Sequence, residues 1–351
     1  MTLALPVPRG AFDLLLSHRP YRLYFASSSM GAFASAVEFI ALGWLVVELS
    51  PGVLGVAAFF AIRFGAKVLL AVPAGLAADR YPRVTLYASM RVMSGLAALL
   101  GAGALLTAWP LEVALLAAGL SAAAHAMDLP AHRALQGDIY PRERLEQAIS
   151  FGTGGFHIAT LLAPIVALPL ATVFGPGMPL LVAGAAFFMA SMPAFRLPST
   201  RVERVAATAK ADVLAAVGFV ARTPLVLGLL LAGCVPSVVD KCVTVMLPSS
   251  SGNEHGAFGV VLAAPEMGAI AIGFGLAAVP WRFSPWIPAV CGAAYVASVA
   301  AVSFAGLAMG PASIGLALFA GGCAKTGLMA SAMAGMQRLV PAEMRGRVMT
   351  V

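Results

Sequence analysis

The sequence Gly-Leu-Ala-Ala-Asp-Arg-Tyr-Pro-Arg at residues 75–83 is a short charged turn between two long apolar segments, at about 53–78 and 85–108. Each segment is long enough to cross a bilayer, because a transmembrane helix needs about 20 consecutive apolar residues. Basic residues concentrate in the cytoplasmic loops of membrane proteins. The stretch therefore predicts two membrane-spanning helices joined by a cytoplasmic turn.

The composition of the whole chain agrees with a membrane protein. Of its 351 residues, 60% are hydrophobic and 11% are charged, and the mean hydropathy is +0.92. Soluble domains carry about 25% charged residues, so the two soluble domains that the length suggests are excluded. Disorder is excluded by the same apolar content. A disulfide framework is excluded because the four cysteines are scattered, at positions 234, 242, 291 and 323.

Glycine, proline and charged residues divide the chain into ten apolar segments, which predict an all-α membrane protein with about ten transmembrane helices. The first twenty residues lack the apolar core and cleavage site of a signal peptide, so we expect a cytoplasmic lead-in there. The predicted spans are 21–48, 53–78, 85–108, 111–129, 146–174, 178–195, 224–247, 256–280, 286–308 and 311–336.

The positions of Lys and Arg predict that the N-terminus is cytoplasmic. With that orientation, 17 of the 22 basic residues fall in cytoplasmic segments or at cytoplasmic helix ends, five fall within spans, and none falls in an outside loop. This asymmetry is typical of the positive-inside pattern. It also argues against nucleic-acid binding, since the positive charge is spread over six short segments instead of one surface.

A repeat of about 200 residues predicts two related halves, at 1–195 and 212–351, joined by a cytoplasmic linker at 196–211. Pro-x-Glu units begin at Pro141 and Pro341, within the loops after the fourth and tenth predicted spans. A chance recurrence of so short a unit is the alternative. With six spans in the first half and four in the second, we expect the last two helices of a twelve-helix protein to be missing.

Residues 75–83 resemble the Gly-x-x-x-Asp-Arg-x-Gly-Arg signature of the major facilitator superfamily. The resemblance implies a fold of two six-helix halves around a central cavity. It implies that Gly75 allows close helix approach, that Asp79 pairs with an arginine of the other half, and that Arg80 and Arg83 hold a cytoplasmic gate. The chain departs from the signature at Pro82, where a glycine is usual.

Three further stretches, at 128–135, 141–148 and 340–349, are similar to loops of the exporters that resemble the enterobactin exporter, a subgroup of transmembrane secretion effectors. This resemblance implies export of a small molecule across a bacterial-type inner membrane. It also implies proton antiport, with the proton gradient as energy source and no cofactor.

Charged residues within the predicted spans are the candidate substrate or proton-coupling residues, because each costs about 2.5–3.5 kcal/mol at a helix centre unless it finds a partner or water. We expect one polar cluster in each half, lining the central cavity, and the alternative is ion pairs that only fasten helices together. The candidates are Glu38, Arg63, Lys67, Asp240, Lys241, Glu266 and Lys325. Arg91, Asp128 and Arg133 are helix-pairing candidates, with the cavity and fastening interpretations left open for Arg91 and Asp128.

Two histidines within spans, His125 and His157, are candidates for a proton relay, although a buried neutral histidine with a hydrogen bond is the favoured interpretation. The cysteines have no metal-ligand spacing, and the chain lacks His-Glu-x-x-His, Gly-x-Ser-x-Gly and phosphate-loop motifs. We therefore expect no metal site and no enzyme. The expected function is secondary transport of a small molecule within the lipid bilayer. The alternative is a truncated partner or inactive remnant that does not transport, and the oligomeric state cannot be read from the sequence.

Overall fold

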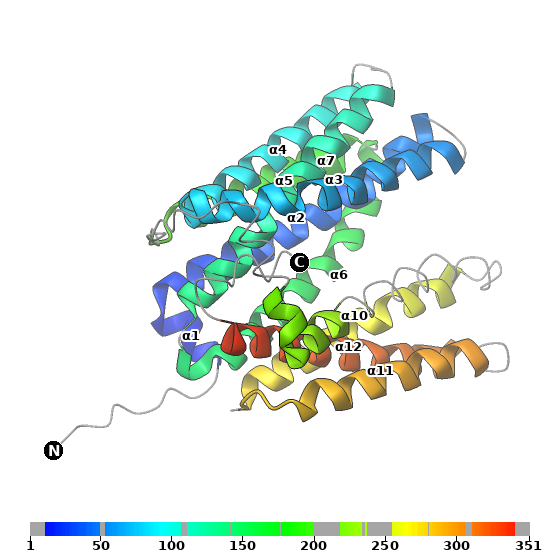
Figure 1. Ribbon diagram of the computed structural model, residues 1–351. Coiled ribbons are helices and arrows are strands. Elements are labelled where there is room, and N and C mark those ends of the chain that lie inside the picture. The colour runs from blue at the N-terminus through cyan, green and yellow to red at the C-terminus, as the bar shows by residue number, and fades with distance from the viewer. Residues whose placement is uncertain are drawn as a thin grey trace. The chain divides into compact units, whose positions relative to one another are not determined.

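The protein is all-helical in the part of the chain that the computed structural model describes (Figure 1). The described residues are 11–49, 53–106, 111–140, 142–175, 177–198, 218–233, 236, 255–279, 281–305 and 311–340. The helices are α1 (Ala11–Ser17), α2 (Arg19–Leu49), α3 (Val53–Arg80), α4 (Arg83–Leu106), α5 (Leu111–Ile139), η1 (Arg142–Arg144), α6 (Leu145–Phe174), α7 (Gly177–Phe195), α10 (His255–Ala278), α11 (Trp286–Ala305) and α12 (Pro311–Leu339).

Eight helices in the described residues are long and apolar enough to cross a membrane, so the chain is a multi-pass membrane protein. Apart from the end of α5, they begin and end close to the predicted spans. Two shorter apolar helices, Pro224–Gly233 and Ala264–Ala278, fall within the predicted spans at 224–247 and 256–280. The count of ten spans and the cytoplasmic N-terminus stay predictions.

Helix α5 continues to Ile139, well beyond the predicted end of the fourth span at 129. The prediction ended the span there because Pro130 and a group of charged residues follow. The helix instead passes through Pro130, and its extension buries Ala131, Leu135 and Ile139. Burial of this apolar face compensates for the hydrogen bond that a proline removes from a helix interior.

The described residues form two compact units that are not continuous in the sequence. The α2–α7 unit comprises residues within 20–139 and 159–218, and the α10–α12 unit comprises residues within 1–19, 140–158 and 219–341. Helix α6 contributes to both, because it passes from one unit to the other after Ile158. The predicted halves at 1–195 and 212–351 stay a prediction, and most of the predicted linker lies outside the described residues.

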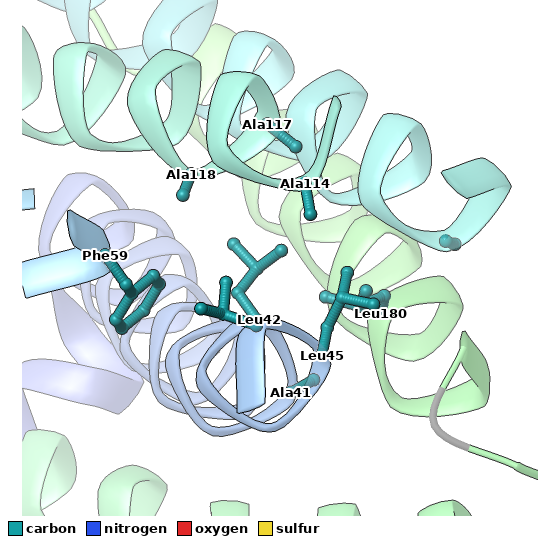
Figure 2. Packing of buried hydrophobic residues seen from close by; sticks show 10 residues of the cluster. Ala41, Leu42, Leu45, Phe59, Ala114, Ala117, Ala118 and Leu180 are labelled. Carbon is teal, nitrogen blue, oxygen red and sulfur yellow. The ribbon is translucent and has the colours of Figure 1, made fainter. Parts of the chain in front are cut away.

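Alanine-rich packing holds the α2–α7 unit together. Figure 2 shows Leu42 and Leu45 of α2 between the alanines of α5 and Leu180 of α7. Small residues at such contacts let the helix backbones approach closely, which supports helix association where both helix and lipid are apolar. The central residues of this cluster are Ala41, Leu42, Leu45, Val46, Phe59, Ala102, Ala114, Ala117, Ala118 and Leu180.

Glycines bring α10 and α12 together in the other unit. A Cβ atom at Gly268 would lie 2.1 Å from the carbonyl oxygen of Phe319, and one at Gly322 would lie 2.0 Å from the carbonyl oxygen of Pro265. Both distances are far shorter than a van der Waals contact, and both involve backbone that cannot rotate away. Glycine at these two positions is therefore a condition of the α10–α12 packing.

We expect Gly322→Ala to lower the free energy of unfolding by about 2 kcal/mol or more, because the two backbones must separate to admit the methyl group. Gly275→Ala on α10 is the matched control, since a Cβ there meets nothing within 4 Å. Alanine should stabilise that helix by up to about 1 kcal/mol. Thermal unfolding in detergent measures both, and equal melting temperatures for the two variants would contradict the packing.

Candidate functional site

Glu38 of α2 and Arg63 of α3 form a buried ion pair at the centre of the α2–α7 unit. Oε2 of Glu38 lies 3.8 Å from Nη1 of Arg63, and the two side chains are 0% and 9% exposed. Glu38 lies about three helical turns before the end of α2, and Arg63 lies about three turns after the start of α3. Both are therefore about 15 Å from these helix ends, which is half the thickness of a bilayer core.

This pair is loosely bonded. The distance of 3.8 Å exceeds a hydrogen bond, and within the described part of the chain neither oxygen of Glu38 accepts a hydrogen bond of ordinary geometry. The Arg63 guanidinium instead lies over two rings, 5.0 Å from the centroid of Phe39 and 5.8 Å from that of Phe59. Cation–π contacts stabilise the guanidinium but leave the carboxylate under-satisfied.

Lys67, one turn after Arg63, does not share its burial. The Lys67 side chain is exposed, with Nζ 5.6 Å from the ring centroid of Phe64. The sequence predicted that the two cations face the same way, and they do lie on the same side of α3 by spacing. The structure distinguishes them, since Arg63 is buried and Lys67 is exposed.

A second polar cluster lies in the same unit around Arg91 of α4. Its Nη2 donates a hydrogen bond of 2.8 Å to the Tyr87 hydroxyl and lies 3.7 Å from Oδ2 of Asp128 on α5. A Cβ at position 31 would lie 1.3 Å from Nη1 of Arg91, so the guanidinium occupies the space that any side chain on Gly31 would fill. Gly31 of α2 is therefore what allows Arg91 to reach between the helices.

Rings complete the Arg91 cluster. The imidazole of His132 stacks against Tyr24 and Tyr87, at centroid distances of 5.4 Å and 5.6 Å. The Tyr24 hydroxyl also lies within hydrogen-bond distance of the His132 ring. Arg133, the third predicted helix-pairing residue, is half-buried. The contacts tie α2, α4 and α5 together, which favours a fastening role for Arg91 and Asp128.

Of the predicted gate residues, the structure shows a side-chain partner for Arg83. Nη1 of Arg83 donates a hydrogen bond of 2.7 Å to Oδ2 of Asp138, which joins the start of α4 to the end of α5. Arg80 is exposed and Gly75 is buried. The side chain of Asp79 lies outside the described residues, so its predicted pairing stays a prediction. Asp138 was not among the sequence candidates.

Glu146 is the principal polar residue that the sequence interpretation missed. It lies in the first turn of α6 and is 2% exposed. Its Oε2 accepts a hydrogen bond of 3.0 Å from Nη2 of Arg338 on α12, and Oε1 accepts one of 3.2 Å from the backbone N–H of Phe283. One carboxylate thus joins three segments of the α10–α12 unit: the start of α6, the segment before α11 and the end of α12.

The internal repeat contained a signal for this site. Residues 275–278 repeat the Gly-Leu-Ala-Ala of 75–78 after 200 positions, and Arg338 lies 200 positions after Asp138. In each repeat the charged residue at this position lies at a helix end and forms an ion pair. If the repeat had been extended from the Pro-x-Glu units to these positions, Arg338 would have become a candidate. Its partner Glu146 would not have been found in this way, because Glu146 lies at a different position of the repeat.

The α10–α12 unit contains one further polar cluster among the described residues, formed by His157 of α6, Glu266 of α10 and Thr326 of α12. Nδ1 of His157 lies 2.8 Å from Oε2 of Glu266, and Nε2 lies 3.4 Å from Oγ1 of Thr326. The sequence grouped Glu266 with Asp240, Lys241 and Lys325. That grouping stays a prediction, and the structure adds to it a contact of Glu266 with a histidine of the fifth predicted span.

The remaining members of the predicted second cluster are placed less fully. Lys325 is half-buried on α12, beside Thr326. Asp240 and Lys241 lie outside the described residues. His125 has the kind of environment that was expected, with Nδ1 2.8 Å from the carbonyl oxygen of Ser121. Among the described residues, no group of three or more His, Cys, Asp or Glu is arranged to hold a metal ion.

Comparisons with known proteins agree with this architecture. A family model described as the Major Facilitator Superfamily matches residues 23–351. A comparison with curated protein sequences found no relative of this chain. Among solved structures, the transporter FucP in its outward conformation is 12% identical with a TM-score of 0.74, and the alignment covers 94% of this chain and 86% of FucP. Another FucP structure is described as the E. coli fucose:proton symporter.

Two further solved structures have the same fold. A bacterial homologue of the iron transporter ferroportin, in its outward-facing state, is 15% identical with a TM-score of 0.64, over 94% of this chain and 87% of that one. The human organic anion transporter TETRAN is 14% identical with a TM-score of 0.64, over 95% of this chain and 88% of that one. At these identities the likeness concerns the fold alone.

We expect Gly31→Ala to destabilise the protein by about 1–3 kcal/mol, because the new methyl group displaces the Arg91 guanidinium and leaves the buried Asp128 carboxylate without its cation. Gly43→Ala on the same helix is the control, since its Cβ would meet only Phe59 at an ordinary 3.8 Å. Thermal unfolding measures the difference. If the destabilisation persists undiminished in an Arg91→Met background, displacement of Arg91 is not its cause.

For the Glu146–Arg338 pair, we expect Arg338→Gln to cost more stability than Glu146→Gln. The first change leaves a carboxylate that is 2% exposed without its cation, whereas the second leaves an arginine whose side chain is 40% exposed and can be hydrated. The coupling energy from a double-mutant cycle should be about 1–2 kcal/mol. The exposed Glu143 supplies the control variant Glu143→Gln, and additive single effects would contradict direct bonding.

Proposed function

The chain belongs to the major facilitator superfamily, and we propose that it is a secondary active transporter that moves a small molecule across the membrane by alternating access. In this mechanism two helical bundles rock about a central site near the bilayer midplane. The observation that carries the proposal is the Glu38–Arg63 pair, because it is charged, central and incompletely bonded. An enzyme is not supported by the fold.

The bonding of Glu38 favours exchange of partners over mere fastening. A pair that only fastens helices gains from hydrogen bonds that offset the cost of burying its charges, as the bond from Arg91 to the Tyr87 hydroxyl does in the second cluster. Glu38 and Arg63 are instead 3.8 Å apart, and the carboxylate lacks hydrogen bonds of ordinary geometry in the described residues. A proton or a polar group of a substrate would satisfy the carboxylate. Glu38 is therefore our first candidate for coupling, and Arg63 for contact with the substrate.

Proton-coupled efflux is the proposed direction and energy source. The similarity of residues 128–135 and 141–148 to loops of the enterobactin-exporter-like subgroup supports export, and intramembrane carboxylates support the use of protons. Positive charge at the reachable Lys67 favours a substrate with an anionic or polar part. An inner membrane of bacterial type fits the same subgroup and the distribution of basic residues.

The charged residues at the predicted cytoplasmic helix ends are proposed to control access from that side. Arg83 with Asp138 and Arg338 with Glu146 join helix ends within each unit. Such contacts stabilise the closed arrangement of the ends that they join, and alternating access requires that one end of the pathway be closed at a time. Two further residues complete the proposed gate: Asp79, and Arg80, which is exposed and lies close to Arg83 in the sequence.

The decisive test is transport in everted membrane vesicles, with a panel of toxic compounds as probes. We expect Glu38→Gln and Arg63→Ala each to lower the rate of proton-driven uptake into the vesicles by roughly tenfold or more. The matched control is Glu112→Gln, which removes an exposed carboxylate at the start of α5. Expression and melting temperature of each variant show whether the fold is retained.

Each outcome has a distinct meaning. Unchanged transport in both site variants would remove Glu38 and Arg63 from the mechanism while leaving the transporter assignment intact. A wild-type chain that folds in the membrane yet moves no compound of the panel would favour the second candidate function, a membrane partner or remnant that does not transport.

A further inference from the structure

Three helices of the α10–α12 unit each bring a polar side chain to the same depth. His157 lies about three and a half turns after the start of α6, and Glu266 and Thr326 lie about as far before the ends of α10 and α12. This is about 18–20 Å along each helix. The three side chains therefore meet near the middle of the bilayer, where a titratable group indicates a functional site by default.

The two titratable members of this cluster are directly bonded and unequally exposed. Nδ1 of His157 and Oε2 of Glu266 are 2.8 Å apart, with side chains 11% and 32% exposed. Because an ionised carboxylate only accepts hydrogen bonds, one proton lies in this contact. Glu266 is thus the more exposed of the two groups, and the imidazole is nearly enclosed. The opposite ring nitrogen, Nε2, lies 3.4 Å from the Thr326 hydroxyl.

Backbone packing holds the cluster in place. A Cβ at Gly273 would lie 2.8 Å from Cα of Gly154, so α6 and α10 touch backbone to backbone one turn before His157. Helix α10 likewise touches α12 at Gly268, close after Glu266. Pro265 lies within α10 directly before Glu266. Such close contacts on both sides fix the distance between the polar groups, as a site needs.

We propose that His157, Glu266 and Thr326 form the proton-exchange site of this transporter. The proposal rests on the transport function proposed above and adds a site for the coupled proton that is separate from Glu38. Histidine is the side chain whose charge changes most readily near neutral pH, which suits it to take up and release a proton in each cycle.

The proton balance is simple. In the unloaded state the neutral imidazole donates from Nδ1 to the Glu266 carboxylate, Nε2 accepts from the Thr326 hydroxyl, and the site carries one negative charge. A proton from solution binds Nε2, the Thr326 hydroxyl turns to accept it, and the net charge becomes zero. Loading thus makes the three side chains neutral as a group and leaves the imidazolium bonded directly to the carboxylate, which lowers the cost of enclosing these groups in the bilayer.

Other ionisable groups on the three helices are few among the described side chains. Lys325 and Cys323 neighbour Thr326 on α12, and the Cys323 thiol donates to the carbonyl oxygen of Gly268 at 3.2 Å. Glu146, in the first turn of α6, pairs with Arg338, in the last turn of α12. Lys325 directly precedes Thr326 and is half-buried.

His157 lies close to the point at which α6 leaves the α10–α12 unit. Residues of α6 up to Ile158 belong to the α10–α12 unit, and the following residues belong to the α2–α7 unit. His157 is therefore the second-last residue that α6 contributes to the unit that holds the site.

The test is a direct count of protons bound by the purified full chain, with protons themselves as the probe. The pH of a weakly buffered detergent solution is stepped from about 8 to about 5, and an indicator dye reports the uptake per molecule. We expect His157→Gln to take up one proton fewer than the wild type, because it lacks the imidazole that binds the proton, and Glu266→Gln to take up that proton only at a lower pH, because the carboxylate that stabilises the imidazolium is gone. Uptake equal to that of the wild type in both variants would overturn the proposal.

His125→Gln is the matched control. His125 is a second histidine within a span, but its described partners are Ser121 and the Phe187 ring, with no carboxylate bonded to the imidazole among the described residues. Its replacement should leave the count unchanged. If His125→Gln lowers the count as much as His157→Gln does, the effect is not specific to the site and the proposal fails.

Thr326 provides a second, milder variant pair that keeps the proposal testable if the His157 and Glu266 variants fold poorly. Thr326→Ser retains the hydroxyl and should bind protons as the wild type does. Thr326→Val is similar in size but lacks the hydroxyl that contacts Nε2 of His157, so the pH at which the proton is taken up should change. Identical uptake curves for the two would remove Thr326 from the site.

This measurement separates the site from the proposed function. Loss of protons in His157→Gln with a wild-type chain that moves no compound in vesicles would leave the proton site standing and refute transport. Transport by the wild type with no change in proton binding in any site variant would support the transporter and refute the site.

Discussion

Charged side chains within the bilayer impose the main constraint on this structure, because each costs several kcal/mol unless another helix supplies a partner. The described partners of the intramembrane charges come from different helices: Glu38 with Arg63, Arg91 with Asp128, and Glu266 with His157. Apolar packing alone discriminates poorly between helix neighbours in lipid. The ion pairs therefore specify which helices are adjacent, and the small residues then allow those helices to approach.

Small residues and charges depend on each other. The Arg91 guanidinium reaches Asp128 through space that only a glycine at position 31 leaves open, and the His157–Glu266 contact is flanked by the close backbone approach of Gly154 and Gly273. The two kinds of pair differ in their bonding. The two pairs have similar distances, 3.8 Å for Glu38–Arg63 and 3.7 Å for Arg91–Asp128, and both arginines lie against aromatic rings. They differ in that Arg91 also donates a hydrogen bond to the Tyr87 hydroxyl and that Glu38 is more deeply buried than Asp128.

Much of the fold was predictable because spans depend on local composition. The long apolar runs predicted the helices, and charge and proline marked most of their ends. Helix α5 extends past the end of its predicted span, where Pro130 and the charged residues after it suggested an end. The reason is tertiary: the extension is buried, and its Asp138 binds Arg83 of α4. A rule that charges end a span fails where those charges have partners on a neighbouring helix.

The sequence by itself determined that this chain lies in a membrane, which segments are apolar enough to cross it and which residues are costly enough there to need a partner, since each of these follows from the composition of a short stretch. Which residues pair with these charged side chains was decided only by the tertiary structure. Glu266 pairs with His157, 109 positions away, and Glu146 pairs with Arg338, 192 positions away. Such pairings depend on how helices cross, and the crossing points are set by backbone contact at glycines that look alike along the chain.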